Sequence, residues 1–283
     1  MRLVVTGAGG MLGQDVVRAA RAVSHDPVAL PRAELDVTDA PAVGAAIADA
    51  RPDAVVNCAA WTDVDGAESA RAAAAAVNAA GAGHVASAAA QAGARLVHVS
   101  SDYVFDGRGR RPYVESDATA PLSVYGATKL DGEHAVQAAG GRYTIVRSSW
   151  LFGAGGPNFV ETMLRLAAER EAISVVADQV GCPTFTGDLA RALVHLAESG
   201  PGGLVHVAGS GACSWHEFAV EIFAQAGVGC RVDEASSAEM ARPAPRPAYS
   251  VLASKRPDAP QLPAWREGLA AYLAERAPAE ASA

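Results

Sequence analysis

The chain has 283 residues, of which 50% are hydrophobic and 19% are charged, and its formal net charge is −8. This composition is typical of a folded chain with a sizeable core, and it excludes a disordered protein. The acidic balance also argues against a nucleic-acid polymer as a partner, because proteins that bind one usually present a basic face.

Cysteine usage and hydropathy exclude further classes. The four cysteines are far apart and form no Cys-x-x-Cys pair, so we expect reduced thiols, with neither a zinc site nor a disulfide framework. No apolar run reaches the roughly 18 residues that a membrane helix needs. The N-terminus begins as a strand and not as a signal peptide. We therefore predict a cytoplasmic protein without a membrane partner.

Short apolar runs alternate with helical patterns through the first half of the chain. Strands are predicted over 3–6, 28–30, 54–57, 96–100 and 144–147, and helices over 11–23, 39–50, 66–92 and 122–139. Strands that are apolar throughout suit a parallel sheet covered on both faces. The repeated strand–helix order predicts an α/β fold, a Rossmann-type doubly wound parallel sheet over residues 1–150.

The pattern loosens after residue 150, where Gly and Pro become frequent. Helices are predicted over 158–170, 186–199, 214–226 and 263–275. We expect a smaller C-terminal lobe over 151–275 that mainly binds substrate, with a strand near 173–176 returning to the first sheet. Residues 276–283 are predicted to form a flexible tail.

A glycine-rich turn follows the first predicted strand. Gly7, Gly10 and Gly13 are spaced G-x-x-G-x-x-G at the start of the first helix. Glycine permits the tight turn, lets backbone amides approach a pyrophosphate and lets the helix pack close to the sheet. The helix N-terminus then supplies N–H donors for phosphates. The turn predicts a dinucleotide-binding site, with an ordinary tight turn as the alternative.

The residues after the second predicted strand bear on which dinucleotide is bound. An NAD-selective site usually carries Asp or Glu there to hold the ribose 2′-hydroxyl. This chain has Pro31 and Arg32 instead. An arginine can meet a 2′-phosphate, which favours NADPH over NADH. The alternative is a solvated surface arginine.

Three residues form a candidate catalytic set. Tyr125 and Lys129 are four residues apart, so on a helix they share one face. Of the 23 basic residues only Lys129 and Lys255 are lysines. A lysine retained at position 129 indicates a need for a compact ammonium beside a phenol, which an arginine could not replace. Ser101 follows a predicted strand at the sheet edge where ligands bind in such folds. Each signal alone is common, but together behind a glycine turn they predict a catalytic site.

Longer motifs surround these residues. They are G-A-G-G-M-L-G (7–13), N-C-A-A-W-T-D-V-D-G-A-E (57–68), H-V-S-S-D-Y-V-F-D-G (98–107), A-P-L-S-V-Y-G-A-T-K-L-D-G-E (120–133), R-S-S-W-L-F-G (147–153) and D-Q-V-G-C-P-T (178–184). On these motifs the sequence resembles the extended short-chain dehydrogenases/reductases over essentially its whole length. Within them it is similar to the dTDP-4-dehydrorhamnose reductase family.

The resemblance implies functions for further residues. Sugar-nucleotide contacts fall on Ser101, Asp102 and Trp150, and Arg246 lies in a segment similar to one near the substrate, where a guanidinium can clamp a diphosphate. Position 31 is Asp in some members of the family and Pro in this chain, so the dual use of NADH and NADPH by those members does not carry over directly, and NADH stays an alternative to NADPH. Cofactor contacts fall on Gly10, Met11, Leu12, Asp36, Val37, Ala60, Trp61 and Thr62, besides Tyr125 and Lys129.

The reaction that the resemblance implies is the NADPH-dependent reduction of the C4 ketone of dTDP-4-dehydro-β-L-rhamnose. Tyr125 is then the general acid, and Ser101 hydrogen-bonds the carbonyl oxygen. Lys129 is expected to lower the pKa of the phenol from its usual value near 10.

Two other functions stay open. A reductase of another dTDP-4-keto-6-deoxysugar would have the same fold and the same three catalytic residues. A non-catalytic NADP-binding regulatory subunit, resembling that of methionine adenosyltransferase, is disfavoured by the intact Ser101, Tyr125 and Lys129. A homodimer is a further expectation. Some family members use a divalent metal at a subunit contact, but no ligand cluster in this sequence predicts a metal.

Overall fold

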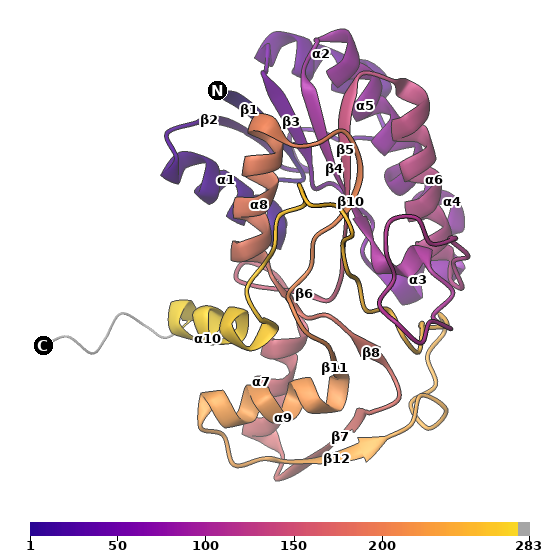
Figure 1. The fold of residues 1–283 in the computed structure, drawn as a ribbon, viewed down its shortest axis with the longest axis vertical. Helices are drawn as coiled ribbons and strands as arrows, with labels where there is room; N and C mark the ends of the chain where they lie inside the picture. The colour runs from indigo at the N-terminus through magenta and orange to yellow at the C-terminus, as the bar shows by residue number, and fades with distance from the viewer. Residues whose placement is uncertain (277–283) are drawn as a thin grey trace, which may run out of the picture.

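The chain folds into two lobes, and a six-stranded parallel sheet forms the frame of the larger lobe (Figure 1). The computed structural model describes residues 1–276. The strands lie in the order β10-β5-β4-β3-β1-β2, and the switch point between β1 and β3 is where such sheets bind ligands. The strands are β1 (Arg2–Thr6), β2 (Asp26–Leu30), β3 (Ala54–Asn57), β4 (Arg95–Ser101), β5 (Arg142–Ser148) and β10 (Gly203–His206).

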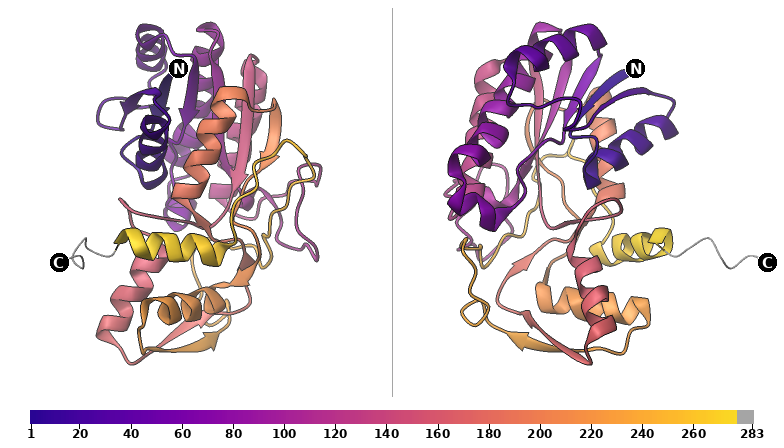
Figure 2. Two further views of the ribbon diagram at one scale, coloured as in Figure 1. Left: turned by 60° about the vertical axis from the view of Figure 1, so that its left-hand side comes forward. Right: turned by 180° about the vertical axis from the view of Figure 1, so that it is seen from behind.

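Helices cover both faces of this sheet (Figure 2). Leu3 and Val5 of β1 pack toward one face and Val4 toward the other, as side chains alternate along a strand. Because both faces are buried, the strands read as continuous apolar runs. The predicted doubly wound α/β sheet is confirmed. One face carries α1 (Met11–Ala22) and α8 (Thr186–Ser199), and the other carries α2 (Ala40–Ala50), α5 (Ala82–Gln91) and α6 (Val124–Ala139).

The stretch 66–92, predicted as one helix, is a series of shorter helical pieces. They are α3 (Val64–Ser69), α4 (Arg71–Ala75), the π-helical turn η1 (Ala76–Gly81) and α5. Ala70 breaks the series with a non-helical φ of −123°. Asn78 lies in the π turn and is 1% exposed, which an alanine-rich pattern could not reveal.

The smaller lobe lies beside the larger lobe (Figures 1 and 2). Its core contains Phe152, Phe218, Trp265 and Tyr272. Its helices are α7 (Phe159–Glu169), α9 (Trp215–Ala226) and α10 (Trp265–Arg276). Its strand pairs are β6 (Leu151–Phe152) with β9 (Thr184–Phe185), β8 (Val180–Gly181) with β11 (Cys213–Ser214), and β7 (Ala172–Val176) with β12 (Arg231–Ala235).

The expectation that a strand near 173–176 returns to the first sheet is wrong. That strand is β7, which pairs with β12 in the smaller lobe, whereas β10 returns and pairs with β5. Ser174 is exposed between the buried Ile173 and Val175, so β7 buries one face only, unlike the strands of the central sheet. Helix α8 also packs on α1. Residues after 150 therefore contribute to both lobes.

Several whole-chain expectations meet the structure here. Arg276 ends α10, and the rest of the predicted tail lies outside the described residues. All four cysteines are free thiols. In residues 1–276, no helix combines the length and the apolarity that crossing a bilayer demands. The same residues contain no cluster of three His, Cys, Asp or Glu side chains that could hold a metal ion.

Candidate active site

The glycine turn lies between the ends of β1 and β3. Gly7 has a φ of +66°, and a Cβ there would lie 2.6 Å from the backbone nitrogen of Ala59. A Cβ on Gly13 would lie 2.3 Å from the carbonyl oxygen of Gly7, so only glycine lets α1 start this close to the turn. Gly10 precedes Met11 as the N-cap and supplies no side-chain cap. The first amides of α1, at Met11, Leu12 and Gly13, are therefore suited to an anion such as a pyrophosphate.

The segment after β2 lies at the rim of this turn. Arg32 and Asp36 are both exposed, and Arg32 is close enough to act on the Asp36 carboxylate. Hydrogen bonds from the amide and hydroxyl of Thr38 lower the pKa of Asp36. Val37 is buried instead and packs against Gly81. A Cβ on Gly81 would lie 2.7 Å from a methyl group of Val37, so glycine permits this close contact. Arg32 is thus placed where a charged cofactor group can reach it, whereas Val37 packs.

Asn78 fixes the loop after β3, and sequence reasoning missed it. The amide of Trp61 donates to Asn78 Oδ1 at 2.9 Å, and Asn78 Nδ2 donates to the carbonyl oxygen of Trp61 at 3.2 Å. The same Nδ2 donates to Thr128 on α6 at 3.0 Å. Ala60 is half-buried and Thr62 is exposed. An isolated Asn in an alanine-rich helix is the signal that could have identified this link between the loop and α6.

The candidate catalytic residues lie at the end of β4 and in the first turns of α6. The Ser101 side chain lies close enough to the phenol of Tyr125 to act on its pKa. Lys129 is 2% exposed, and its Nζ donates to the carbonyl oxygen of Val99 at 2.7 Å. The hydroxyl of Ser123 caps α6 by accepting from the amide of Gly126 at 3.1 Å.

Burial shifts the pKa of both groups on α6. It raises the pKa of Tyr125 to about 12, opposed by the nearby Ser101 hydroxyl and reinforced by the charge of Asp102. It lowers the pKa of Lys129 to about 8, opposed by Glu133. Lys129 is not among the groups that shift the pKa of Tyr125 here, because its ammonium donates to the carbonyl oxygen of Val99. The expected effect of Lys129 on the phenol stays a prediction.

Asp102 is a buried carboxyl beside this set. It is 1% exposed, and Ser101 Oγ donates to its Oδ1 at 2.9 Å. Burial raises the pKa of Asp102 to about 6, opposed by the nearby hydroxyl of Ser250 and by the hydrogen bond from Ser101. Asp102 therefore touches the serine hydroxyl that the sequence assigns to the substrate carbonyl.

Trp150 belongs to an aromatic cluster of the smaller lobe. Its ring stacks on Trp215 with centroids 3.6 Å apart and planes 6° apart. Its φ of +48° is unusual for a residue other than glycine. A Cβ on Gly181 would lie 2.4 Å from the Trp150 ring. One flat face of this predicted substrate contact is thus already covered by Trp215.

Arg246 follows the elements of the smaller lobe in sequence, but its side chain contacts residues of the larger lobe. Its Nη2 donates to Asp65 Oδ2 at 2.8 Å and its Nη1 donates to the carbonyl oxygen of Ala244 at 2.6 Å. The guanidinium lowers the pKa of Asp65 to about 2. The Arg246 guanidinium also lies close to the phenol of Tyr103, whose ring meets that of Tyr125 edge-on at 5.4 Å. Sequence reasoning missed Tyr103, although it follows Ser101 by two residues.

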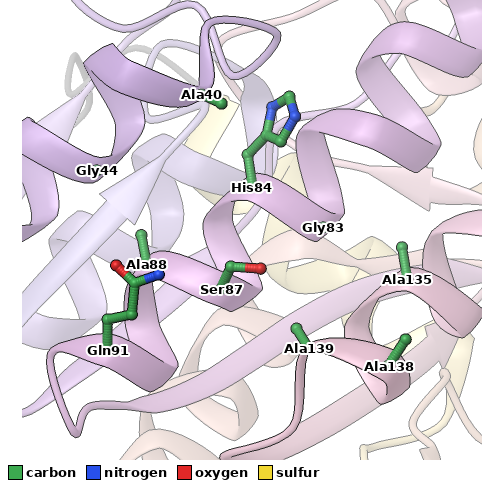
Figure 3. A pocket seen from close by; sticks show the side chains of 10 residues that line it. All are labelled: Ala40, Gly44, Gly83, His84, Ser87, Ala88, Gln91, Ala135, Ala138 and Ala139. Carbon is green, nitrogen blue, oxygen red and sulfur yellow. The ribbon is translucent and has the colours of Figure 1, made fainter.

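A groove on the outer side of α2, α5 and α6 lies apart from these residues (Figure 3). Small side chains such as Ala88 and Ala139 line it, together with the polar His84, Ser87 and Gln91. No candidate catalytic or cofactor residue lines it. Its shape follows from alanine-rich helices that cannot fill the space between their axes.

The fold and the site together define a class. A doubly wound parallel sheet with a glycine turn at its switch point holds dinucleotides, and a serine, a tyrosine and a lysine gather at the same edge. These features are those of a short-chain dehydrogenase/reductase, an NAD(P)-dependent oxidoreductase.

Comparisons with known proteins identify the family. The RmlD substrate binding domain matches residues 1–277. A dTDP-4-dehydrorhamnose reductase of Streptomyces griseus is 46% identical over 98% of this chain and 93% of its own length. A dTDP-4-keto-6-deoxy-D-glucose reductase of Streptomyces niveus is 43% identical over 94% and 90%. The crystal structure of a Bacillus anthracis dTDP-4-dehydrorhamnose reductase in complex with NADP has a TM-score of 0.94 at 40% identity, covering 97% of this chain and 99% of that one. The chain belongs to the dTDP-4-dehydrorhamnose reductase family, which confirms the predicted family and enzyme class.

Proposed function

We propose that this protein reduces the C4 ketone of dTDP-4-dehydro-β-L-rhamnose to give dTDP-L-rhamnose, with NADPH as the reductant. The observation that carries the proposal is the close approach of Ser101 to Tyr125, with Lys129 one helical turn on, at the sheet edge that holds the glycine turn. The name of the Streptomyces griseus relative supports the choice of substrate. We also propose that most substrate contacts come from the lobe within residues 151–275.

The mechanism follows from the side chains. A nicotinamide held beside these residues would supply the hydride that reduces the carbonyl carbon. Tyr125 keeps its proton at neutral pH because its pKa is about 12, and it donates that proton to the oxygen as negative charge develops there. Ser101 hydrogen-bonds the same oxygen, as a one-donor relative of an oxyanion hole. We expect the Lys129 ammonium to stabilise the phenolate that remains, and Lys129 would also hold the ribose of a bound nicotinamide.

The structure supports a dinucleotide at the glycine turn. The free amides of residues 11–13 would hold the pyrophosphate, and the exposed Arg32 would meet the 2′-phosphate of NADPH. Asp36 and Val37 follow on the same segment, while Ala60, Trp61 and Thr62 line the loop opposite. NADH lacks the 2′-phosphate and gains nothing from Arg32.

Replacing Arg32 should therefore separate the two coenzymes. We expect Arg32→Ala to raise the KM for NADPH about tenfold, since a hydrogen bond to a charged group contributes about 1.5–3 kcal/mol. The KM for NADH should stay unchanged. Steady-state kinetics with each coenzyme measures both values, and Arg170→Ala, an exposed arginine of the smaller lobe, is the control. An equal change with both coenzymes would assign Arg32 to the surface.

Arg246 is the proposed clamp for the substrate diphosphate. The diphosphate must then compete with Asp65 for the guanidinium. We expect Arg246→Ala to raise the KM for the sugar nucleotide about tenfold or more and to leave the Kd for NADPH unchanged. Arg242→Ala is the matched control, because Arg242 also pairs with Asp65, at 3.5 Å, but its side chain is 62% exposed. Weaker NADPH binding with an unchanged substrate KM would exclude this function of Arg246.

The direct test is NADPH oxidation with enzymatically prepared dTDP-4-dehydro-L-rhamnose. Rapid oxidation with formation of dTDP-L-rhamnose is the expected result. The Streptomyces niveus relative favours one second candidate, a reductase of another dTDP-4-keto-6-deoxysugar. A panel of 4-keto sugar nucleotides separates the two. Tight NADPH binding without oxidation of any of them would point to the regulatory-subunit alternative.

Two expectations stay predictions. A homodimer can be measured by light scattering after gel filtration, and a cytoplasmic location by cell fractionation. The sequence predicts no metal site, and elemental analysis of the purified protein tests for a bound divalent metal.

A further inference from the structure

A buried ion pair beneath the catalytic helix has no part in the mechanism above. Glu133 lies on α6 one turn after Lys129, and both are 2% exposed. Arg147 of β5 donates from Nε to Glu133 Oε1 at 2.8 Å and from Nη2 to Oε2 at 2.6 Å. Ser100 Oγ donates to the same Oε1 at 2.5 Å. Both carboxylate oxygens of Glu133 are therefore held from two neighbouring strands.

These contacts join α6 to the edge of the sheet where the chemistry lies. Ser100 directly precedes Ser101 at the end of β4. The Arg147 guanidinium carbon lies 5.0 Å from the centroid of the Phe105 ring, which fixes its plane. A buried ion pair is a poor source of stability, because desolvating two charges offsets their attraction. The position of the pair, next to Lys129, therefore suggests a function in the site.

The titratable groups around Lys129 show what that function is. Cys58 approaches from the end of β3 and His98 from β4. Burial raises the pKa of Cys58 to about 12 and holds the pKa of His98 well below its usual value. Both side chains are therefore neutral between pH 6 and 9. Tyr125 is neutral for the same reason. Within residues 1–276 this leaves the Glu133 carboxylate as the charge that raises the pKa of Lys129 against burial.

We propose that Glu133 is a positioning residue of the reductase, whose carboxylate, fixed by Arg147 and Ser100, keeps Lys129 in its ammonium form next to Tyr125. A buried amine without this counter-charge would lose its proton within the range where the enzyme works. The catalytic consequence rests on the proposed function. The charge state of Lys129 does not, and it can be measured without turnover.

The sequence offers a direct measurement, because Lys129 and Lys255 are its only lysines. Lysine labelled with ¹³C at Cε should give two signals in the full-length protein, and Lys255→Arg assigns them. Lys255 is exposed and serves as an internal reference. We expect Glu133→Gln to lower the titration midpoint of Lys129 by about one pH unit, the size that a nearby opposite charge produces. The midpoint of Lys255 should not move.

A second variant removes an ambiguity. Glu133→Gln leaves the Arg147 charge buried without its partner, which lowers the pKa of Lys129 by itself and destabilises the fold. The double variant Glu133→Gln/Arg147→Met removes both charges, and it decides the test if the single variant does not fold. Its Lys129 midpoint should also fall, and the alkaline limb of kcat/KM should move with it. Asp131→Asn, an exposed carboxylate on α6, should change neither. A wild-type Lys129 midpoint in the double variant would overturn the proposal, even if turnover fell.

Discussion

Tyr125→Phe should lower kcat by about 10²–10⁴-fold, the usual contribution of a positioned general acid. The phenol is the proton donor in the proposed reaction, and its pKa of about 12 means that it is protonated whenever substrate binds. The ring stays, so packing against Val124 and the Kd for NADPH should change little. Stopped-assay kinetics and fluorescence titration with NADPH measure the two quantities.

Tyr103→Phe is the informative control, because its ring meets that of Tyr125 at 5.4 Å. Its hydroxyl lies close to the Arg246 guanidinium, so we expect a higher KM for the sugar nucleotide and a kcat within a few-fold of wild type. If Tyr103→Phe abolished turnover and Tyr125→Phe did not, the acid would have been assigned to the wrong tyrosine.

Gly13→Ala should destabilise the protein by about 1–3 kcal/mol and abolish measurable NADPH binding. The added Cβ would lie 2.3 Å from the carbonyl oxygen of Gly7 and 2.8 Å from Ala8 Cα. Backbone on both sides must move, and the amides at the start of α1 move with it. Thermal unfolding and calorimetric titration with NADPH measure both effects.

Gly44→Ala provides the matched control within a helix. No atom lies within 4 Å of a Cβ at Gly44, and the residue is in the middle of α2. Alanine there should stabilise the protein by about 0.5–1 kcal/mol through helix propensity. Wild-type stability and NADPH affinity in Gly13→Ala would mean that the turn is looser than the structure indicates.

The central sheet could be predicted from the sequence because its strands bury both faces. The strand 54–57 has the predicted bounds, and the other four predicted strands extend by one to three residues at their ends. The smaller lobe could not be assigned in the same way. Its strand β7 and the returning β10 are both short and apolar, and only partners distant in sequence distinguish them.

The candidate site shows the same division. Ser101, Tyr125 and Lys129 follow local rules, namely a strand end and a helical spacing, so the sequence placed them on the right elements. The Asp65–Arg246 pair joins residues far apart in the chain, and no local pattern marks it. The π turn that carries Asn78 depends in the same way on contact with α6, where Gly132 allows close approach. Features that depend on contacts between residues distant in sequence could therefore not be predicted from local sequence patterns.

The late return of α8 and β10 has a consequence for how the chain can fold as it is synthesised. When residues 1–150 have left the ribosome, five of the six strands exist, but β5 still has an unpaired edge. The face bearing Val97 and Val146 also lacks α8 until residue 199 has been made. An incomplete sheet with an open edge and an uncovered apolar face is prone to aggregate. The sheet of the dinucleotide-binding lobe can therefore be completed only after β10, which ends at His206, has been translated.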